Sequence, residues 1–97
     1  MKIVNFAEKN SELNRFVAEI RDIHIQQDRL RFRKNLERIG EVMSYEISKD
    51  FRYSEKLVTT PLGTARVNTA DDKIVIGTIL RAGIPYHQGF LNYFDQA

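Results

Sequence analysis

The sequence predicts an α/β fold, and three observations lead to this prediction. Two segments in the first half place apolar residues at helical spacing, two short segments flank a proline and glycine turn, and a continuous apolar run precedes a glycine-containing loop. Ninety-seven residues are enough for one core. We therefore expect residues 1–97 to form a single domain with two amphipathic helices, a β-hairpin and a first parallel core strand with its following helix.

The first half of the chain carries the helical pattern. Residues 2–6 are rich in β-formers and are interpreted as a short strand or an extended arm. A helix is predicted from Ser11 onward, with Asn10 or Ser11 as its N-cap, because Leu13, Phe16, Val17 and Ile20 share one helical face. A longer helix is predicted over residues 28–47, where no proline interrupts the stripe of Phe32, Leu36, Ile39 and Met43. Gly40 weakens this second helix without breaking it.

The periodicity changes after residue 50. Strands are predicted over residues 56–60 and 64–67, on either side of the sequence Thr60, Pro61, Leu62 and Gly63. Proline at the second and glycine at the fourth position suit a type I turn, so we expect a β-hairpin. Residues 68–72 are polar and form a connection.

The run from residue 74 to residue 80 is apolar on both alternating faces, which is typical of a parallel strand covered on both sides. A short loop follows at residues 81–84, and Pro85 then favours the start of a helix over residues 86–96. A βαβ unit takes about 30 residues or more, so the second parallel strand has no place before residue 97. Either another chain completes the sheet or the sequence is a piece of a longer protein, and we favour the second explanation.

The loop at residues 81–84 is the candidate ligand site. In open α/β sheets, ligands bind where a loop leaves the carboxyl end of a buried strand. Amides at a helix start attract anions, Gly83 permits close backbone approach, and Arg81 offers a donor fork that matches phosphate oxygens. These features favour a phosphate or pyrophosphate ligand. The alternative is an ordinary strand-to-helix turn whose arginine is only solvated.

Four short elements, in this order, resemble the beginning of the uracil phosphoribosyltransferase family. The run Ile79, Leu80, Arg81, Ala82 and Gly83 is similar to the ILRAG element of that family. Three upstream elements resemble its IRD, FR and YE elements, and they are Ile20 to Asp22, Phe32 with Arg33, and Tyr45 with Glu46. The resemblance spans residues 13–89, and its weight lies in the order and spacing of these elements.

The resemblance implies a type I phosphoribosyltransferase fold and the reaction of uracil with phosphoribosyl pyrophosphate to give uridine monophosphate and pyrophosphate, with Mg²⁺ on the sugar substrate. It also implies that Arg81 contacts phosphoribosyl pyrophosphate, that Ala82 and Gly83 contribute backbone contacts, and that the peptide between Leu80 and Arg81 is cis. The chain departs from the family pattern in two places. Gln88 stands before Gly89 where an acidic residue is usual, and neither the acidic phosphate-ribose motif nor the uracil-reading segment is present.

We therefore expect no turnover from these 97 residues, and the catalytic residues are left unassigned. Two alternatives stay open. The parent enzyme is another nucleobase phosphoribosyltransferase, or the chain is a noncatalytic dimerisation or interaction module. The unpaired edge of the predicted strand 74–80 and the aromatic-rich last helix predict self-association, and thus a homo-oligomer.

Composition argues against several other classes. A net charge of +2 does not indicate a polyanion-binding surface. The basic residues of the second helix are interspersed with Asp28, Glu37 and Glu41, which predicts an ion-paired, solvated face and no nucleic-acid partner. These basic residues are Arg29, Arg31, Arg33, Lys34 and Arg38.

The chain has no cysteine, so disulfides and thiolate metal sites are excluded and a cytoplasmic location is expected. His24 and His87 lack the spacing of metal ligands, and no metal site is predicted. No apolar run approaches the length of a membrane span, and the apolar stretch at the N-terminus stops at Ala7, short of a signal-peptide core.

Overall fold

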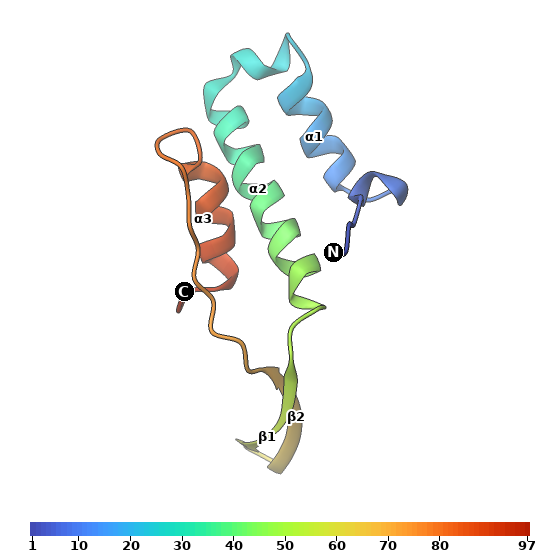
Figure 1. Cartoon of the computed structure of the whole chain (residues 1–97), viewed down its shortest axis with the longest axis vertical. Helices are drawn as coiled ribbons and strands as arrows, with labels where there is room; N and C mark the ends of the chain where they lie inside the picture. The colour runs from blue at the N-terminus through green and yellow to red at the C-terminus, as the bar shows by residue number, and fades with distance from the viewer.

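In the computed structural model, which describes residues 1–97, three α-helices pack together and a two-stranded hairpin extends from them (Figure 1). The longest helix, α2 (Arg29–Ser48), lies between α1 (Leu13–Arg21) and α3 (Ile84–Tyr93). Two 3₁₀ turns, Phe6–Glu8 and Ile25–Gln27, precede α1 and α2. No helix combines the length and the apolar character that crossing a membrane requires.

Helices α1 and α2 confirm the predicted helical patterns. All eight predicted stripe residues are buried or half-buried, and the fully buried ones are Leu13 and Ile39. The expected N-cap of α1 was wrong by one residue or more, since Glu12 holds that position. The Ser11 hydroxyl still accepts a hydrogen bond from the amide of Leu13 at 3.3 Å. Helix α2 begins after Asp28, whose carboxylate caps it by accepting from the amide of Arg31 at 3.0 Å.

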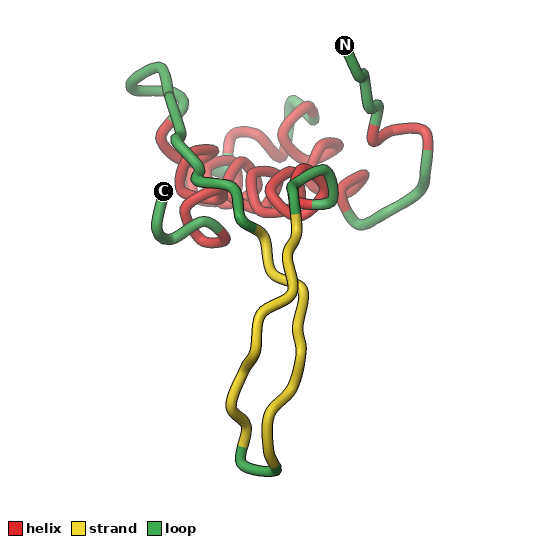
Figure 2. Tube along the Cα trace, turned by 60° about the horizontal axis from the view of Figure 1, so that its bottom comes forward, coloured by secondary structure: helices red, strands yellow, loops and turns green.

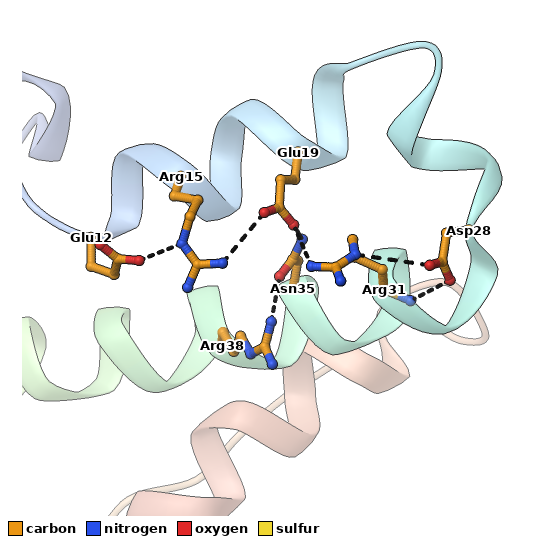
Figure 3. Close-up of polar contacts among 7 residues, drawn as sticks. All are labelled: Glu12, Arg15, Glu19, Asp28, Arg31, Asn35 and Arg38. Atoms are coloured by element: carbon orange, nitrogen blue, oxygen red, sulfur yellow. Dashed lines mark hydrogen bonds and ion pairs between the residues drawn. The ribbon is translucent and has the colours of Figure 1, made fainter.

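A polar cluster centred on Glu19 joins α1 to α2 (Figure 3). The Glu19 carboxylate accepts from Asn35 Nδ2 at 2.7 Å and pairs with Arg31 at 3.2 Å and Arg15 at 3.4 Å. Asn35 is completely buried, and its carbonyl oxygen accepts from Arg38 at 3.0 Å. The hydrogen bond from Asn35 lowers the pKa of Glu19, and this effect, with the help of Arg31, exceeds the opposing effect of burial. The cluster thus provides hydrogen-bond partners both for the buried side-chain amide of Asn35 and for the carboxylate of Glu19 between the helices.

The hairpin pairs β1 (Tyr53–Thr60) with β2 (Gly63–Ala70) in antiparallel register, with Tyr53 opposite Ala70 and Thr60 opposite Gly63. The predicted hairpin is thus confirmed, and both strands are longer than predicted. Pro61 and Leu62 form the turn, and Gly63 has φ 137°, a value that favours glycine. The hairpin projects away from the helices, and nearly all its residues are exposed (Figure 2).

The strand predicted over residues 74–80 does not form, and of the two interpretations of residues 2–6, a short strand or an extended arm, the structure agrees with the arm. Residues 2–6 belong to no sheet, and this arm is tied to the body by an ion pair of Lys2 with Asp50 at 2.8 Å. Residues 74–80 also lack a strand partner, and Val75, Ile79 and Leu80 are 92%, 88% and 70% exposed. The physical reason is that a parallel strand needs a neighbouring strand for its backbone hydrogen bonds, and the only sheet in this chain is the hairpin.

Helix α3 packs on α2 through two glycines. A methyl group added to Gly89 would lie 2.8 Å from the Gly40 Cα and would also overlap the Glu37 carbonyl oxygen. On the same interface, Asn92 Nδ2 donates to the carboxylates of Glu37 and Glu41, each at 2.8 Å. Gly40, predicted as a weakness of the helix, is therefore a point where α3 packs closely against the α2 backbone.

Candidate phosphate-binding loop

The candidate loop connects residues 74–80 to the N-terminus of α3. In Figure 1 it lies at the end of the molecule opposite the hairpin. Two backbone hydrogen bonds shape it, from the Gly83 amide to the Ile79 carbonyl and from the Ile84 amide to the Arg81 carbonyl, both at 3.1 Å. The helix starts at Ile84, two residues earlier than predicted, and ends at Tyr93, because Phe94 leaves helical geometry with φ −104° and ψ 64°.

The loop leaves two backbone donors free. The amides of Arg81 and Ala82 donate no hydrogen bond within the chain, whereas the amide of Gly83 is already used. Both residues are exposed, and no side chain caps the N-terminus of α3. A helix N-terminus carries partial positive charge, so these amides favour an anion.

The side chain of Arg81 lies on the exposed side of the loop. Its guanidinium belongs to none of the ion pairs of the chain. The peptide bond between Leu80 and Arg81 is cis, as the resemblance implied. An unpaired guanidinium beside two free amides is a donor set that matches phosphate oxygens.

Gly83 is needed where it stands because the loop folds back on itself. A methyl group there would lie 2.5 Å from the Thr78 hydroxyl oxygen and 2.7 Å from the Ile79 carbonyl oxygen. The structure therefore assigns Gly83 the role of making room, while Ala82 is the residue with a free amide. Whether these residues bind phosphate stays a prediction.

A cleft of about 550 Å³ lies beside the loop, between residues 72–78 and the side chains of α3. Its lining is mostly apolar, and Phe90 packs edge-on against Tyr86 with ring centroids 5.0 Å apart. Burial raises the pKa of Tyr86. The half-buried His87 has its Nδ1 in this region without a hydrogen-bond partner. An apolar cleft is a poor match for a phosphate, so the exposed loop is the better candidate.

The remaining candidate residues lie elsewhere. His24 is exposed in the turn between α1 and α2, and the chain has no group of three His, Asp or Glu side chains that could hold a metal ion. In the basic run, Arg31 pairs with Glu19 and Asp28, and Lys34 pairs with Glu37 at 3.6 Å. The predicted ion pairing is thus confirmed for Arg31 and Lys34, whereas Arg29, Arg33 and Arg38 belong to no ion pair.

Sequence reasoning located the loop and missed two of its properties. The free amide of Ala82 and the contact of Thr78 with Gly83 both depend on the return of the backbone between residues 79 and 83. In the sequence, this contact is visible only as a β-branched residue, Thr78, followed five positions later by a glycine, Gly83. That spacing is too common to predict a contact.

Comparison with known proteins shows which family this chain resembles. The family model for uracil phosphoribosyltransferase matches residues 7–97. Proteins named uracil phosphoribosyltransferase from two strains of Porphyromonas gingivalis, ATCC 33277 and W83, are each 58% identical over 95 residues, which cover 98% of this chain and 44% of the relative. The protein of the same name from Pyrococcus furiosus is 36% identical over 83 residues, covering 84% of this chain and 35% of the relative. The chain thus spans less than half the length of the curated relatives it matches.

Proposed function

The chain belongs to the uracil phosphoribosyltransferase family, and we propose that it supplies the loop that holds phosphoribosyl pyrophosphate in the reaction of that family. In this reaction, a ring nitrogen of uracil loses its proton and bonds to the anomeric carbon of the sugar, the bond from that carbon to pyrophosphate breaks, and uridine monophosphate and pyrophosphate are the products. Arg81 and the amides of Arg81 and Ala82 bind the diphosphate. Gly83 lets the backbone approach it.

The observation that carries this proposal is the donor set of the loop. Negative charge grows on the pyrophosphate oxygen as its bond to the sugar breaks, and fixed donors at that position stabilise the transition state more than the ground state. The two free amides lie just before the start of α3, and the unpaired guanidinium belongs to the same loop. The amides need little rearrangement to receive an anion, since the loop is already closed by its two internal hydrogen bonds.

Mg²⁺ is proposed to enter with the substrate. Magnesium in such sites is bound largely by substrate phosphate oxygens and water, with few protein carboxylates. The Mg²⁺ would neutralise charge on the diphosphate, while the loop residues orient it.

Uracil is favoured over other nucleobases as the acceptor because every relative compared above carries that name. We further propose a cytoplasmic protein that associates with copies of itself and has no nucleic-acid partner. The exposed apolar side chains of residues 74–80 support the association, and the ion-paired face of α2 supports the lack of a nucleic-acid partner. A purely noncatalytic interaction module would not need the free donors of the loop.

A chimeric enzyme tests the function directly. The 95 matched residues of the Porphyromonas gingivalis protein are replaced by those of this chain, and formation of uridine monophosphate from uracil and phosphoribosyl pyrophosphate is measured with Mg²⁺. We expect turnover, and we expect Arg81→Ala to reduce it. Arg66→Ala is the matched control, since Arg66 lies on the distant hairpin and pairs only with Glu55. A well-folded chimera that uses another base and not uracil would contradict the proposal.

A further inference from the structure

We propose that Thr78 is a positioning residue that sets the shape of the loop carrying Arg81. This inference rests on the proposed function of the loop and adds a residue outside its donor set. The side chain of Thr78 occupies the space beside Gly83 that a Cβ atom would otherwise fill. In this way it supports the backbone return from residue 78 to residue 83, in which the amides of Arg81 and Ala82 stay without acceptors in the chain.

The close approach of Thr78 to Gly83 is the first step of the argument. A Cβ built on Gly83 would lie 2.5 Å from Thr78 Oγ1, so the hydroxyl sits against the Cα of the glycine. Thr78 Oγ1 has no hydrogen-bond partner among those found in the chain, and the contact is one of shape. A β-branched side chain is stiff about χ1, so Thr78 holds this position better than an unbranched residue would.

The second step is that little else holds the loop. Ile79 and Leu80 are 88% and 70% exposed and therefore give the loop no apolar anchor. The hydrogen bond from the Gly83 amide to the Ile79 carbonyl closes the return, and a Cβ on Gly83 would approach both that carbonyl oxygen and the Thr78 hydroxyl. Loss of the Thr78 side chain would leave the loop to be maintained by its two backbone hydrogen bonds, and only the one from Gly83 to Ile79 closes this return.

The third step is the contrast with the neighbouring Gly77. A Cβ on Gly77 would meet nothing within 4 Å, so the segment is tightly built only at Gly83. The geometry of the loop thus depends on a pair of residues, one that fills the space and one that leaves it open.

Three variants of Thr78 separate positioning from direct ligand contact. Thr78→Ala removes the branch, Thr78→Val keeps the shape without the hydroxyl, and Thr78→Ser keeps a hydroxyl without the branch. Binding of phosphoribosyl pyrophosphate with Mg²⁺ to the chain is measured by isothermal titration calorimetry, and thermal unfolding is followed in parallel. We expect Thr78→Ala to weaken binding about tenfold because preorganisation is lost, Thr78→Val to restore the affinity, and unfolding to be unchanged. Equal binding by Thr78→Ala and the unchanged chain would overturn the proposal. So would a Thr78→Val variant that binds as weakly as Thr78→Ala while Thr78→Ser binds normally, since the hydroxyl would then be a ligand contact.

A ligand-free measurement keeps this proposal distinguishable from the proposed function. Hydrogen exchange of the Gly83 amide reports opening of the loop. We expect exchange to become about tenfold faster in Thr78→Ala and to stay unchanged in Thr78→Val and in the control Gly77→Ala. If the unchanged chain fails to bind phosphoribosyl pyrophosphate, the proposed function is contradicted, and the Gly83 exchange rates still decide the role of Thr78. Equal rates in all variants would refute that role.

Discussion

Gly40 of α2 and Gly89 of α3 face each other so closely that neither has room for a side chain. A methyl group on Gly89 would lie 2.8 Å from both the Gly40 Cα and the Glu41 amide nitrogen. Since backbone atoms cannot swing away, the interface can relieve such an overlap only by moving a helix. Because α3 begins directly after the candidate loop, this glycine pair also fixes where the loop lies relative to α2.

Gly89→Ala is therefore expected to destabilise the chain. Overpacking against backbone costs about 3 kcal/mol, whereas the gain in helix propensity is about 1 kcal/mol, so the net loss is about 2 kcal/mol. Urea unfolding followed by circular dichroism measures it. Gly77→Ala, which adds the same methyl group where nothing lies within 4 Å, is the control. A Gly89→Ala variant as stable as the unchanged chain would mean that the two helices do not meet at these residues.

The lowered pKa of Glu19 predicts how stability depends on pH. A carboxyl whose pKa in the folded chain lies below its ordinary value of 4.5 stabilises the fold fully above that value. The stabilisation is lost as the pH falls through the folded pKa. Glu19→Gln should thus lower the unfolding midpoint at pH 7, and its difference from the unchanged chain should shrink toward pH 2.

The control for this measurement is Glu8→Gln, because Glu8 is exposed and forms no ion pair. Thermal unfolding of both variants between pH 7 and pH 2 separates the cluster around Glu19 from the general loss of charge in acid. Identical pH profiles for the two variants would show that Asn35 and Arg31 do not favour the ionised form of Glu19.

The exposed apolar side chains of residues 74–80 predict self-association. Val75 is 92% exposed on a segment without strand partners, and such surfaces tend to be covered by other chains. We expect the chain to sediment as an oligomer and Val75→Lys to shift it toward the monomer. Ile3→Lys, at a residue 81% exposed on the N-terminal arm, should have no effect. A folded monomer at high concentration would contradict this prediction.

The sequence predicted the parts of the fold that depend on local order. The stripes of α1 and α2 are visible because residues three and four apart share a helix face, and the hairpin because Pro61 and Gly63 favour a turn. The prediction of a strand over residues 74–80 was wrong for this chain. An apolar pattern indicates that a segment can join a sheet, but it does not indicate whether a neighbouring strand is present.

The parts that were missed join residues far apart along the chain. Glu19 contacts Asn35, sixteen positions away, and no periodic pattern connects a carboxylate to a buried amide on another helix. Gly40 was interpreted through its own helix, where it costs stability, although its role is set by Gly89 on α3. The motif around Arg81 predicted where the loop lies. The sequence could not show that the amides of Arg81 and Ala82 are free while the Gly83 amide is hydrogen-bonded, because this depends on the backbone geometry.

The most direct test of the central claim is the binding of phosphoribosyl pyrophosphate, with Mg²⁺, to the chain and to its Arg81→Ala variant, measured by isothermal titration calorimetry. Hydrogen bonds from a charged donor contribute about 1.5–3 kcal/mol, so the affinity should fall by about tenfold or more. Arg81→Lys should recover it only in part, because a lysine cannot reproduce the planar donor fork. Arg66→Ala should bind as the unchanged chain does. Equal affinities of the Arg81→Ala variant and the unchanged chain would contradict the account.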